Sequence, residues 1–514
     1  MNLLYPYGKE KTRKIFPDTY QHLALAELVD RIAIKEYDRK LVQAVFENIP
    51  TDLATIRFRQ DILRDFMGNE AFCLALAAAL KKLDVLKEFQ SNNHYLQRKK
   101  ASIWDLIDYM EEMEVYIQVI EEINTLFVEH TVTSKGLTEI AVSLRDVIDT
   151  ERLEELKEFV SSMKADISTL KSVTVGINLT PELHPEEIII LDLNKFPFRS
   201  RLRHVNWSAS MASQRVISYK EPSQLMKYMT QDMERELAEQ VRKCKKQLRS
   251  YINLSGYFLL DICDDLKYYL LLASFARKLE ENGYTVCLPK LQEDAEQVMM
   301  KGVYNVRLTE KNTEQIVKND FSFSAKEKIY ILTGPNRGGK TMLTQAVGIA
   351  AFMAAQGLYV LADEYAGFTF ENIMTHFPAD ENQTLDMGRL GEEAVRIREI
   401  LKEATPRTLL LLNETYSSTC ASDGLYLAND LVHILKYRDI PTIFNTHIHE
   451  LARSVSQMNQ WEGKSDVVSL TMEIKDNVNT FRVLRSEPDT CSYAQNIARK
   501  YGVTFEQMLE ETKK

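Results

Sequence analysis

Near the start of its last third the chain reads Lys328-Ile329-Tyr330-Ile331-Leu332-Thr333-Gly334-Pro335-Asn336-Arg337-Gly338-Gly339-Lys340-Thr341. The apolar residues at the start of this stretch predict a buried strand, and Met342 to Ala355 predict a helix whose amino terminus faces the loop between them. The loop itself matches the G-x-x-x-x-G-K-[ST] pattern that holds nucleotide phosphates. We therefore expect a nucleotide-binding α/β domain.

Each part of such a loop has a chemical task. The glycines let backbone N–H groups converge on the phosphates, Lys340 places a cation between the β- and γ-phosphates, and the Thr341 hydroxyl can ligate Mg²⁺. A chance glycine-rich turn is the alternative, which the flanking strand and helix disfavour. The expected cofactor-binding residues are Gly334, Pro335, Asn336, Arg337, Gly338, Gly339, Lys340 and Thr341.

A second apolar strand, Thr408-Leu409-Leu410-Leu411-Leu412, ends in Asn413 and Glu414. P-loop enzymes usually have Asp-Glu here, in which the Asp steadies Mg²⁺ and the Glu orients or deprotonates the attacking water. Losing the Asp charge weakens metal stabilisation by up to a few kcal/mol, at an effective dielectric of about 20. The amide oxygen of Asn413 still accepts a hydrogen bond. We expect Thr341 and Asn413 to hold Mg²⁺, ATP binding to persist, and hydrolysis by way of Glu414 to be slow.

A third strand, Ile443-Phe444-Asn445, runs into Thr446 and His447. A histidine at that place is a candidate sensor of the γ-phosphate, so His447 joins Glu414 as an expected catalytic residue. The alternative is that His447 is structural, as most isolated histidines are.

The composition indicates a globular protein. The chain has 514 residues, of which 45% are hydrophobic, and a formal net charge of −10, which disfavours a protein that coats nucleic acid over its whole surface. No apolar run approaches the ~20 residues needed to cross a bilayer, and the amino terminus does not resemble a secretory signal. The six cysteines are scattered without metal-ligand spacing. We expect a cytoplasmic protein with reduced thiols and no membrane partner.

The organisation changes along the chain. From Thr19 to about Leu170 the apolar spacing predicts long amphipathic helices. Short β-rich runs at 173–178 and 188–191 predict a small strand-containing insert, and a single long helix is predicted from Leu225 to Ile252. From about Val306 onward, strands alternate with helices, as in a mostly parallel α/β sheet.

At this point the residues resemble the MutS family of DNA mismatch-repair ATPases. The stretch from Thr333 to Thr341 resembles the family's T-G-P-N-M-G-G-K-S, with Arg337 in place of the Met. Residues 413–425 resemble D-E-x-x-x-G-T followed by x-D-G-L, and 446–451 are similar to T-H-x-x-E-L. Toward the end of the chain, 492–503 look like the segment that precedes the family's dimerising end.

The resemblance implies the fold class, which is an α/β P-loop (ABC-type) ATPase domain at the C-terminus, preceded by a long, mainly α-helical core and lever region with a small β-containing clamp insert. The implied domains are a helical core at 1–100, lever helices at 101–305 with the clamp-like insert near 171–225, and the ATPase domain at 306–514. The resemblance also implies a homodimer, ATP and Mg²⁺ as cofactors, and DNA as the partner.

Three departures limit this inference. The sequence has almost nothing before the core, so we expect the mismatch-recognition and connector domains to be lacking; the triplet Phe127-Val128-Glu129 only imitates the mismatch-reading motif, because it lies in helical sequence. The loop that reaches the partner's γ-phosphate with a serine in the family reads Gly388-Arg389-Leu390 here, and Arg389 can supply a charge instead. The third departure is Asn413 itself.

The best candidate for DNA contact is the run from Lys195 to Trp207, where Arg199, Arg201 and Arg203 interleave with aromatic residues. A solvated basic loop is the alternative. Such residues do not read base sequence, so selectivity would rest on DNA shape or branching.

The leading hypothesis is an ATP-binding, MutS-like clamp that binds structured, branched or mismatched DNA as a dimer, in DNA repair or recombination, with slow hydrolysis. Its rival is a nucleotide-gated scaffold that hydrolyses little or no ATP and holds protein partners instead of DNA. An active motor coupled to another cargo agrees least with Asn413.

Overall fold

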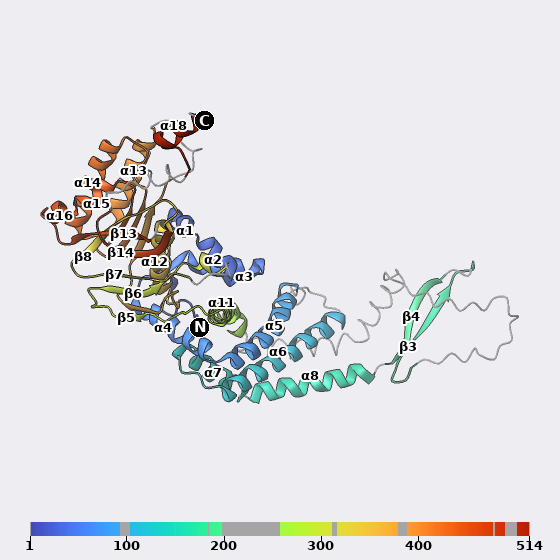
Figure 1. Cartoon of the computed structure of the whole chain (residues 1–514). Coiled ribbons are helices and arrows are strands. Elements are labelled where there is room, and N and C mark those ends of the chain that lie inside the picture. Colours follow the sequence, from blue (N-terminus) through green and yellow to red (C-terminus); the bar gives the residue numbers. More distant parts are fainter. Residues whose placement is uncertain are drawn as a thin grey trace. The chain divides into compact units, whose positions relative to one another are not determined.

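The computed structural model describes residues 2–92, 103–149, 151–169, 171–182, 185–197, 258–310, 316–378, 388–475, 478–488 and 501–512 (Figure 1). Two compact units divide the chain. The first comprises Met1–Glu70, Thr133–Gly136 and Asp264–Lys514, and the second comprises Ala71–Val132 and Leu137–Cys263. None of the helices in the described residues is long and apolar enough to span a membrane.

The first unit is built around a six-stranded sheet in the order β10-β11-β12-β8-β13-β14. All neighbouring pairs are parallel except β13 and β14, which are antiparallel. The mostly parallel sheet predicted from Val306 onward is therefore confirmed. Its strands are β8 (Glu327–Thr333), β10 (Asn372–His376), β11 (Thr408–Asn413), β12 (Thr442–Asn445), β13 (Asp466–Lys475) and β14 (Val478–Arg485).

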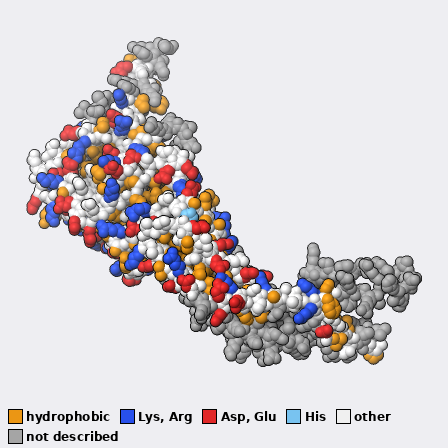
Figure 2. All heavy atoms as spheres, turned by 90° about the horizontal axis from the view of Figure 1, so that it is seen from below, with side chains coloured by type: hydrophobic (Ala, Val, Ile, Leu, Met, Phe, Trp, Pro, Cys, Tyr) orange, Lys and Arg blue, Asp and Glu red, His pale blue; other side chains and the backbone are white. Residues whose placement is uncertain are grey.

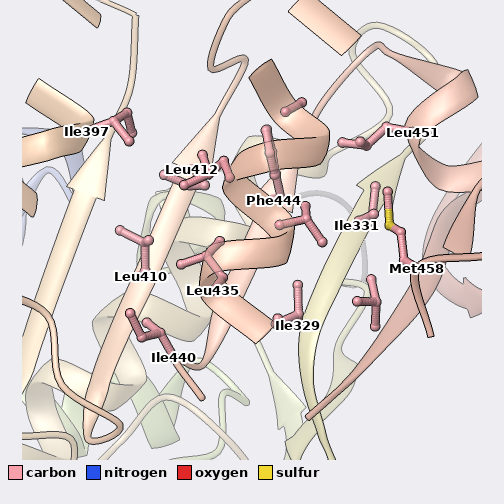
Figure 3. Close-up of a cluster of buried hydrophobic side chains, with 14 of the residues drawn as sticks. Ile329, Ile331, Ile397, Leu410, Leu412, Leu435, Ile440, Phe444, Leu451 and Met458 are labelled. Atoms are coloured by element: carbon pink, nitrogen blue, oxygen red, sulfur yellow. The ribbon is translucent and has the colours of Figure 1, made fainter. Parts of the chain in front are cut away.

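Helices cover both faces of this sheet. On one face α12 (Lys340–Ala355) contacts β10, β11 and β12, and nearly all of its side chains are buried. On the other face a hydrophobic cluster joins the sheet to α13 (Gly388–Glu403), α14 (Ala421–Arg438), α15 (His449–Arg453) and α16 (Val455–Met458). Figure 3 shows how its side chains gather between the strands and the helices. Ten of them are Ile329, Ile331, Ile397, Leu410, Leu412, Leu435, Ile440, Phe444, Leu451 and Met458.

A smaller sheet in the first unit has the order β5-β9-β6-β7. It contributes one wall of the pocket described below. Its strands are β5 (Lys290–Leu291), β6 (Val298–Val303), β7 (Asn319–Phe323) and β9 (Glu364–Gly367). The other described helical elements from residue 258 onward are α11 (Phe258–Glu281), the 3-10 helix Val306–Glu310 and α18 (Phe505–Thr512).

The amino-terminal residues of the first unit are mostly helical, and hydrogen bonds join them to Gln356 at the end of α12. The Gln356 amide donates to the carbonyls of Val45 and Phe46 at 3.3 and 3.2 Å, and its oxygen accepts from the buried Arg59 at 2.8 Å. The helix that begins at the nucleotide loop thus ends on the amino-terminal helices. These elements are the 3-10 helix Lys9–Lys11, β1 (Thr12–Lys14), α1 (Pro17–His22), α2 (Leu25–Ile32), α3 (Glu36–Phe46), β2 (Asn48–Pro50) and α4 (Leu53–Gly68).

In its described residues, the second unit contains helices and a hairpin. The apolar spacing that predicts a helix up to Leu170 is confirmed by α8, in which Leu153, Leu156 and Val160 are buried. The predicted strand insert is also confirmed, because β3 and β4 pair antiparallel. The elements are α5 (Glu70–Asn92), α6 (Ile103–Glu129), α7 (Lys135–Ile148), α8 (Glu151–Thr169), β3 (Ser172–Leu179) and β4 (Pro185–Asn194).

Phe127 is a core residue of the second unit, as the sequence predicts. It lies in α6, is 6% exposed and makes an edge-to-face contact with Phe72, with ring centroids 5.4 Å apart. The predicted long helix from Leu225 to Ile252 lies outside the described residues.

Candidate nucleotide-binding site

The candidate site lies where three neighbouring parallel strands end. In the order β11-β12-β8, these strands lead into Asn413 and Glu414, into Thr446 and His447, and into the loop Gly334–Gly339. Because the carboxyl ends of parallel strands meet at one edge of a sheet, residues far apart in the chain converge there. The predicted cofactor-binding and catalytic residues are thereby brought together.

The loop between β8 and α12 has the backbone that phosphate binding requires. Gly334 and Gly339 have φ values of 138° and 93°, which side-chain-bearing residues rarely adopt. A Cβ at Gly334 would also lie 2.8 Å from the Cβ of Met472, so β13 packs directly against the loop. Arg337 takes a φ of 62° between them. The loop therefore carries its N–H groups into α12 without a side chain in the way.

Lys340, the first residue of α12, is 6% exposed. Its Nζ donates to the carbonyl oxygens of Gly334 and Pro335, at 3.0 and 3.2 Å. Burial lowers the pKa of Lys340, and the nearby Glu414 carboxylate partly offsets that. A buried cation without a salt bridge is costly, and an anion bound in this loop would reduce the cost.

Three polar side chains meet beside the loop. The Thr341 hydroxyl lies 3.2 Å from the amide oxygen of Asn413, and the same oxygen accepts a hydrogen bond from Nδ2 of Asn445. Asn413 and Asn445 are register partners on β11 and β12. Asn445 is not among the site residues predicted from the sequence. The feature that could have indicated it is its position as the last residue of the strand before Thr446.

The Asn445 side chain is 0% exposed, and its amide oxygen Oδ1 has no hydrogen-bond partner. Buried carbonyl oxygens are nearly always paired with protein or water, so this atom lacks the donor that a completed site would supply. Thr341 Oγ1 and Asn413 Oδ1 are hard oxygen donors of the kind that Mg²⁺ prefers. Within the described ranges no group of three or more His, Cys, Asp or Glu side chains is placed to hold a metal ion.

Glu414 and His447 are in contact. The Nε2 atom of His447 lies 2.9 Å from Oε1 of Glu414, and the His447 side chain is 43% exposed. Glu414 has a φ of 54°, a strained value for a residue with a side chain, and its N–H donates to the carbonyl of Asn445 at 2.9 Å. The backbone after β11 thus turns the carboxylate toward the loop side of the sheet.

Two further contacts hold the segment after Glu414. Tyr416 has a φ of 62°, and its N–H donates to Oε2 of Glu393 on α13 at 3.0 Å. The hydroxyl of Thr415 lies 2.9 Å from Nδ1 of His376 at the end of β10. Burial lowers the pKa of His376 to about 4, so this histidine is neutral at physiological pH.

A pocket of about 440 Å³ adjoins the loop. Its polar side is formed by residues 335–341 together with Glu414 and His447. Its other side is apolar and includes Leu308, Ile316 and Phe481. Phe481 is held in place because its carbonyl accepts from Asn319 Nδ2 at 3.0 Å. A phosphate loop next to an apolar cavity suits a nucleoside triphosphate. No sequence motif indicates this apolar side.

Some predicted site residues cannot be placed. Arg199, Arg201 and Arg203 lie outside the described residues, as does the side chain of Arg389.

The residues of this site lie in a part of the chain that is similar to known proteins. The family model described as MutS domain V matches residues 330–513, and the model described as MutS2 N-terminal domain matches residues 51–282. Similar curated proteins are each described as a DNA mismatch repair protein MutS. The protein from Shouchella clausii is 29% identical over 44% of this chain and 25% of its own length, and that from Solibacter usitatus is 29% identical over 45% and 26%. The protein from Chlorobaculum tepidum is 22% identical over 96% of this chain and 54% of its own length, so the chain spans about half of that relative.

Proposed function

From the similarity to MutS proteins we propose that the chain is a MutS-like protein that binds ATP with Mg²⁺, hydrolyses it slowly, and uses the bound nucleotide to control a dimeric DNA clamp. The proposal rests on the phosphate loop beside a pocket of about 440 Å³. Its lysine, Lys340, is buried and donates to backbone carbonyls instead of forming a salt bridge with a carboxylate. The triphosphate would replace the loop carbonyls as the partner of Lys340 Nζ. The purine would occupy the apolar side, next to Phe481.

Mg²⁺ would be held by the Thr341 hydroxyl and by Asn413, directly or through water. When bound, the ion supplies charge neutralisation between the β- and γ-phosphates. The residues fit such an ion because they present oxygen donors and because the buried side-chain Oδ1 of Asn445 lacks a partner. The absence of a carboxylate at 413 favours weaker metal stabilisation than in an Asp-Glu site.

Slow hydrolysis follows from the division of tasks. Glu414 would orient or deprotonate water, and His447, which contacts it at 2.9 Å, would report the γ-phosphate to that carboxylate. With Asn413 in place of Asp, the transition state has less electrostatic support from the metal.

DNA binding is supported by the similarity to proteins described as DNA mismatch repair protein MutS. Dimerisation is what the resemblance to that family implies. The helices of the second unit suit a lever, and the β3/β4 hairpin suits a clamp. The proposed domains are the helical core at 1–100, the lever helices at 101–305 with the clamp-like insert near 171–225, and the ATPase domain at 306–514. Arg199, Arg201 and Arg203 are the proposed DNA contacts.

A nucleotide-gated scaffold that holds protein partners is the second candidate. It is favoured by Asn413 and by the formal net charge of −10. On the face drawn in Figure 2, Lys and Arg side chains are interspersed with Asp and Glu over the described residues, and no broad area of positive charge stands out. Such a surface gives little attraction to a phosphate backbone.

Steady-state ATP turnover tests the proposal. The purified chain would be assayed without DNA, with plain duplex, with mismatched duplex and with a four-way junction, using Lys340→Ala as the blank. Stimulation by one DNA form above the blank, together with DNA affinity that falls steeply with salt, is the expected result. The scaffold would be favoured if the chain binds nucleotide but shows no turnover in any of the four assays and binds none of the three DNA forms.

A further inference from the structure

The amide side chains of Asn413 and Asn445 form a pair at the edge of the sheet where the phosphate loop begins. They are directly opposite in the register of β11 and β12, and they are 8% and 0% exposed. Neither strand pairing nor core packing requires a polar side chain at these two positions, since buried positions of parallel strands are usually apolar. Two buried amides here therefore call for a chemical explanation.

The hydrogen bonds of the pair are unequal. Asn413 Oδ1 takes both donors, the hydroxyl of Thr341 at 3.2 Å and Nδ2 of Asn445. A carbonyl oxygen accepts about two hydrogen bonds, so Asn413 Oδ1 can take a metal-bound water only by releasing one of these donors, and Asn413 offers no second oxygen. A carboxylate at that position would have a second oxygen for a metal-bound water, whereas the other side-chain atom of Asn413 is an N–H₂ donor that repels the hydrogens of such a water.

The missing acceptor is present on Asn445. Its Oδ1 is buried and has no hydrogen-bond partner, while its Nδ2 lies 3.5 Å from the Thr341 hydroxyl and also contacts Asn413. Within one amide, oxygen and nitrogen are only about 2.3 Å apart, as the standard backbone dimensions imply for any planar amide. The free oxygen is therefore at most about 6 Å from the hydroxyl of Thr341, the expected metal ligand.

We propose that Asn413 and Asn445 together replace the carboxylate of an ordinary P-loop metal site. Asn445 is a positioning residue: its N–H fixes the Asn413 amide with the oxygen toward Thr341, and its own carbonyl accepts a hydrogen bond from metal-bound water. This inference rests on the proposed binding of a metal–nucleotide complex, and it assigns the second oxygen of that site to a residue on a different strand.

The test is a double-mutant cycle that measures metal binding. Free Mn²⁺ would be followed by electron paramagnetic resonance as it binds the full chain with a non-hydrolysable ATP analogue. The variants are Asn445→Ala, Asn413→Asp and the double substitution. The control is Asn372→Ala. Asn372 is a buried asparagine of the same sheet, 4% exposed, and it is the first residue of β10, so it lies at the end of the strands away from the phosphate loop.

Asn445→Ala is expected to weaken Mn²⁺ binding about tenfold, the lower end for loss of an outer-shell partner, while affinity for the analogue in EDTA stays unchanged. In the Asn413→Asp background the same substitution is expected to cost less than about twofold, because a carboxylate already supplies both oxygens. An equal loss in both backgrounds, or no loss in the original one, overturns the proposal.

A second variant covers the case in which Asn445→Ala fails to fold. Asn445→Asp keeps the size and the acceptor oxygen and removes the N–H, but it adds a negative charge beside the metal that outweighs the lost hydrogen bond. Mn²⁺ is therefore expected to bind at least as tightly as in the unmodified chain, and weaker binding overturns the proposal. If the unmodified chain binds the analogue equally well in Mn²⁺ and in EDTA, the proposed metal–nucleotide site fails as a whole. If its binding depends on Mn²⁺ but ignores residue 445, only the role of the amide pair fails.

Discussion

Nε2 of His447 lies 2.9 Å from Oε1 of Glu414, at the ends of the neighbouring strands β12 and β11, which α14 separates in the chain. The contact joins the candidate general base to a histidine that is 43% exposed on the pocket side. A carboxylate held in this way can orient a water molecule while remaining accessible to it.

Glu414→Gln is therefore expected to lower ATP turnover by about 100-fold or more, the usual size of a lost general base. Gln keeps the side-chain volume and an oxygen for His447, so nucleotide affinity should change little. Single-turnover hydrolysis and equilibrium binding of a fluorescent ATP analogue measure the two effects separately. Equal losses of binding and turnover would contradict the assignment of Glu414 to the chemical step.

Asn413→Asp is expected to increase both metal affinity and turnover. A carboxylate about 4 to 5 Å from the metal gains up to a few kcal/mol at an effective dielectric of about 20, so tenfold tighter Mg²⁺ binding is a modest expectation. The dependence of turnover on Mg²⁺ concentration gives the measurement. If the variant turns ATP over no faster at saturating Mg²⁺, then Asn413 is not what slows hydrolysis.

Phe481→Ala is expected to weaken nucleotide binding by about 1–3 kcal/mol, the usual cost of losing an aromatic side chain stacked on a base. Phe481 lines the pocket and is 46% exposed in this structure. Leu484→Ala is the matched control, because Leu484 lies on the same strand with 44% exposure but does not line the pocket. Comparison of ATP with inorganic triphosphate separates the two sides of the pocket, since only ATP should lose affinity.

Much of the fold could be predicted because its signals are local. The apolar run ending at Thr333 and the glycine-rich loop determine β8 and α12, and the leucines of β11 identify a strand buried on both faces. The helical period of α8 and the β-rich runs of β3 and β4 are equally local signals.

The candidate site was only partly predictable because half of it comes from long-range packing. Nothing near Asn445 in sequence indicates that it contacts Asn413, because that contact depends on the order of the strands in the sheet. Likewise Phe481 reaches the pocket from β14, which lies two strands from β8, and Ile316 reaches it from the residues before β7. Motif spacing predicts the phosphate side of such a site and is silent about the base side.

Glu393→Ala is expected to destabilise the first unit by about 1.5–2 kcal/mol, the lower part of the range for a hydrogen bond to a charged group, because Glu393 is partly exposed. Its carboxylate accepts from the N–H of Tyr416, which holds a φ of 62°. Glu393→Gln keeps an acceptor and should cost less than half as much. Urea unfolding followed by circular dichroism compares the three proteins, and equal losses for Ala and Gln would show that the charge matters more than this hydrogen bond.

Lys340→Met is expected to stabilise the nucleotide-free protein while abolishing stabilisation by ATP. Burial lowers the pKa of Lys340 below its ordinary value of 10.5, so the unfolded chain binds more protons than the folded one over the alkaline range between the two pKa values. Stability from this residue must therefore rise with pH across that range, and its burial penalty is largest below the lowered pKa. Met carries no charge, so the variant should unfold at a higher urea concentration at pH 7 than the original chain, and the difference should shrink as the pH approaches 10.5. Unfolding curves at pH 7 and at alkaline pH, each with and without ATP, test this, and a difference that does not change with pH would mean that lost hydrogen bonds to Gly334 and Pro335, rather than the buried charge, dominate.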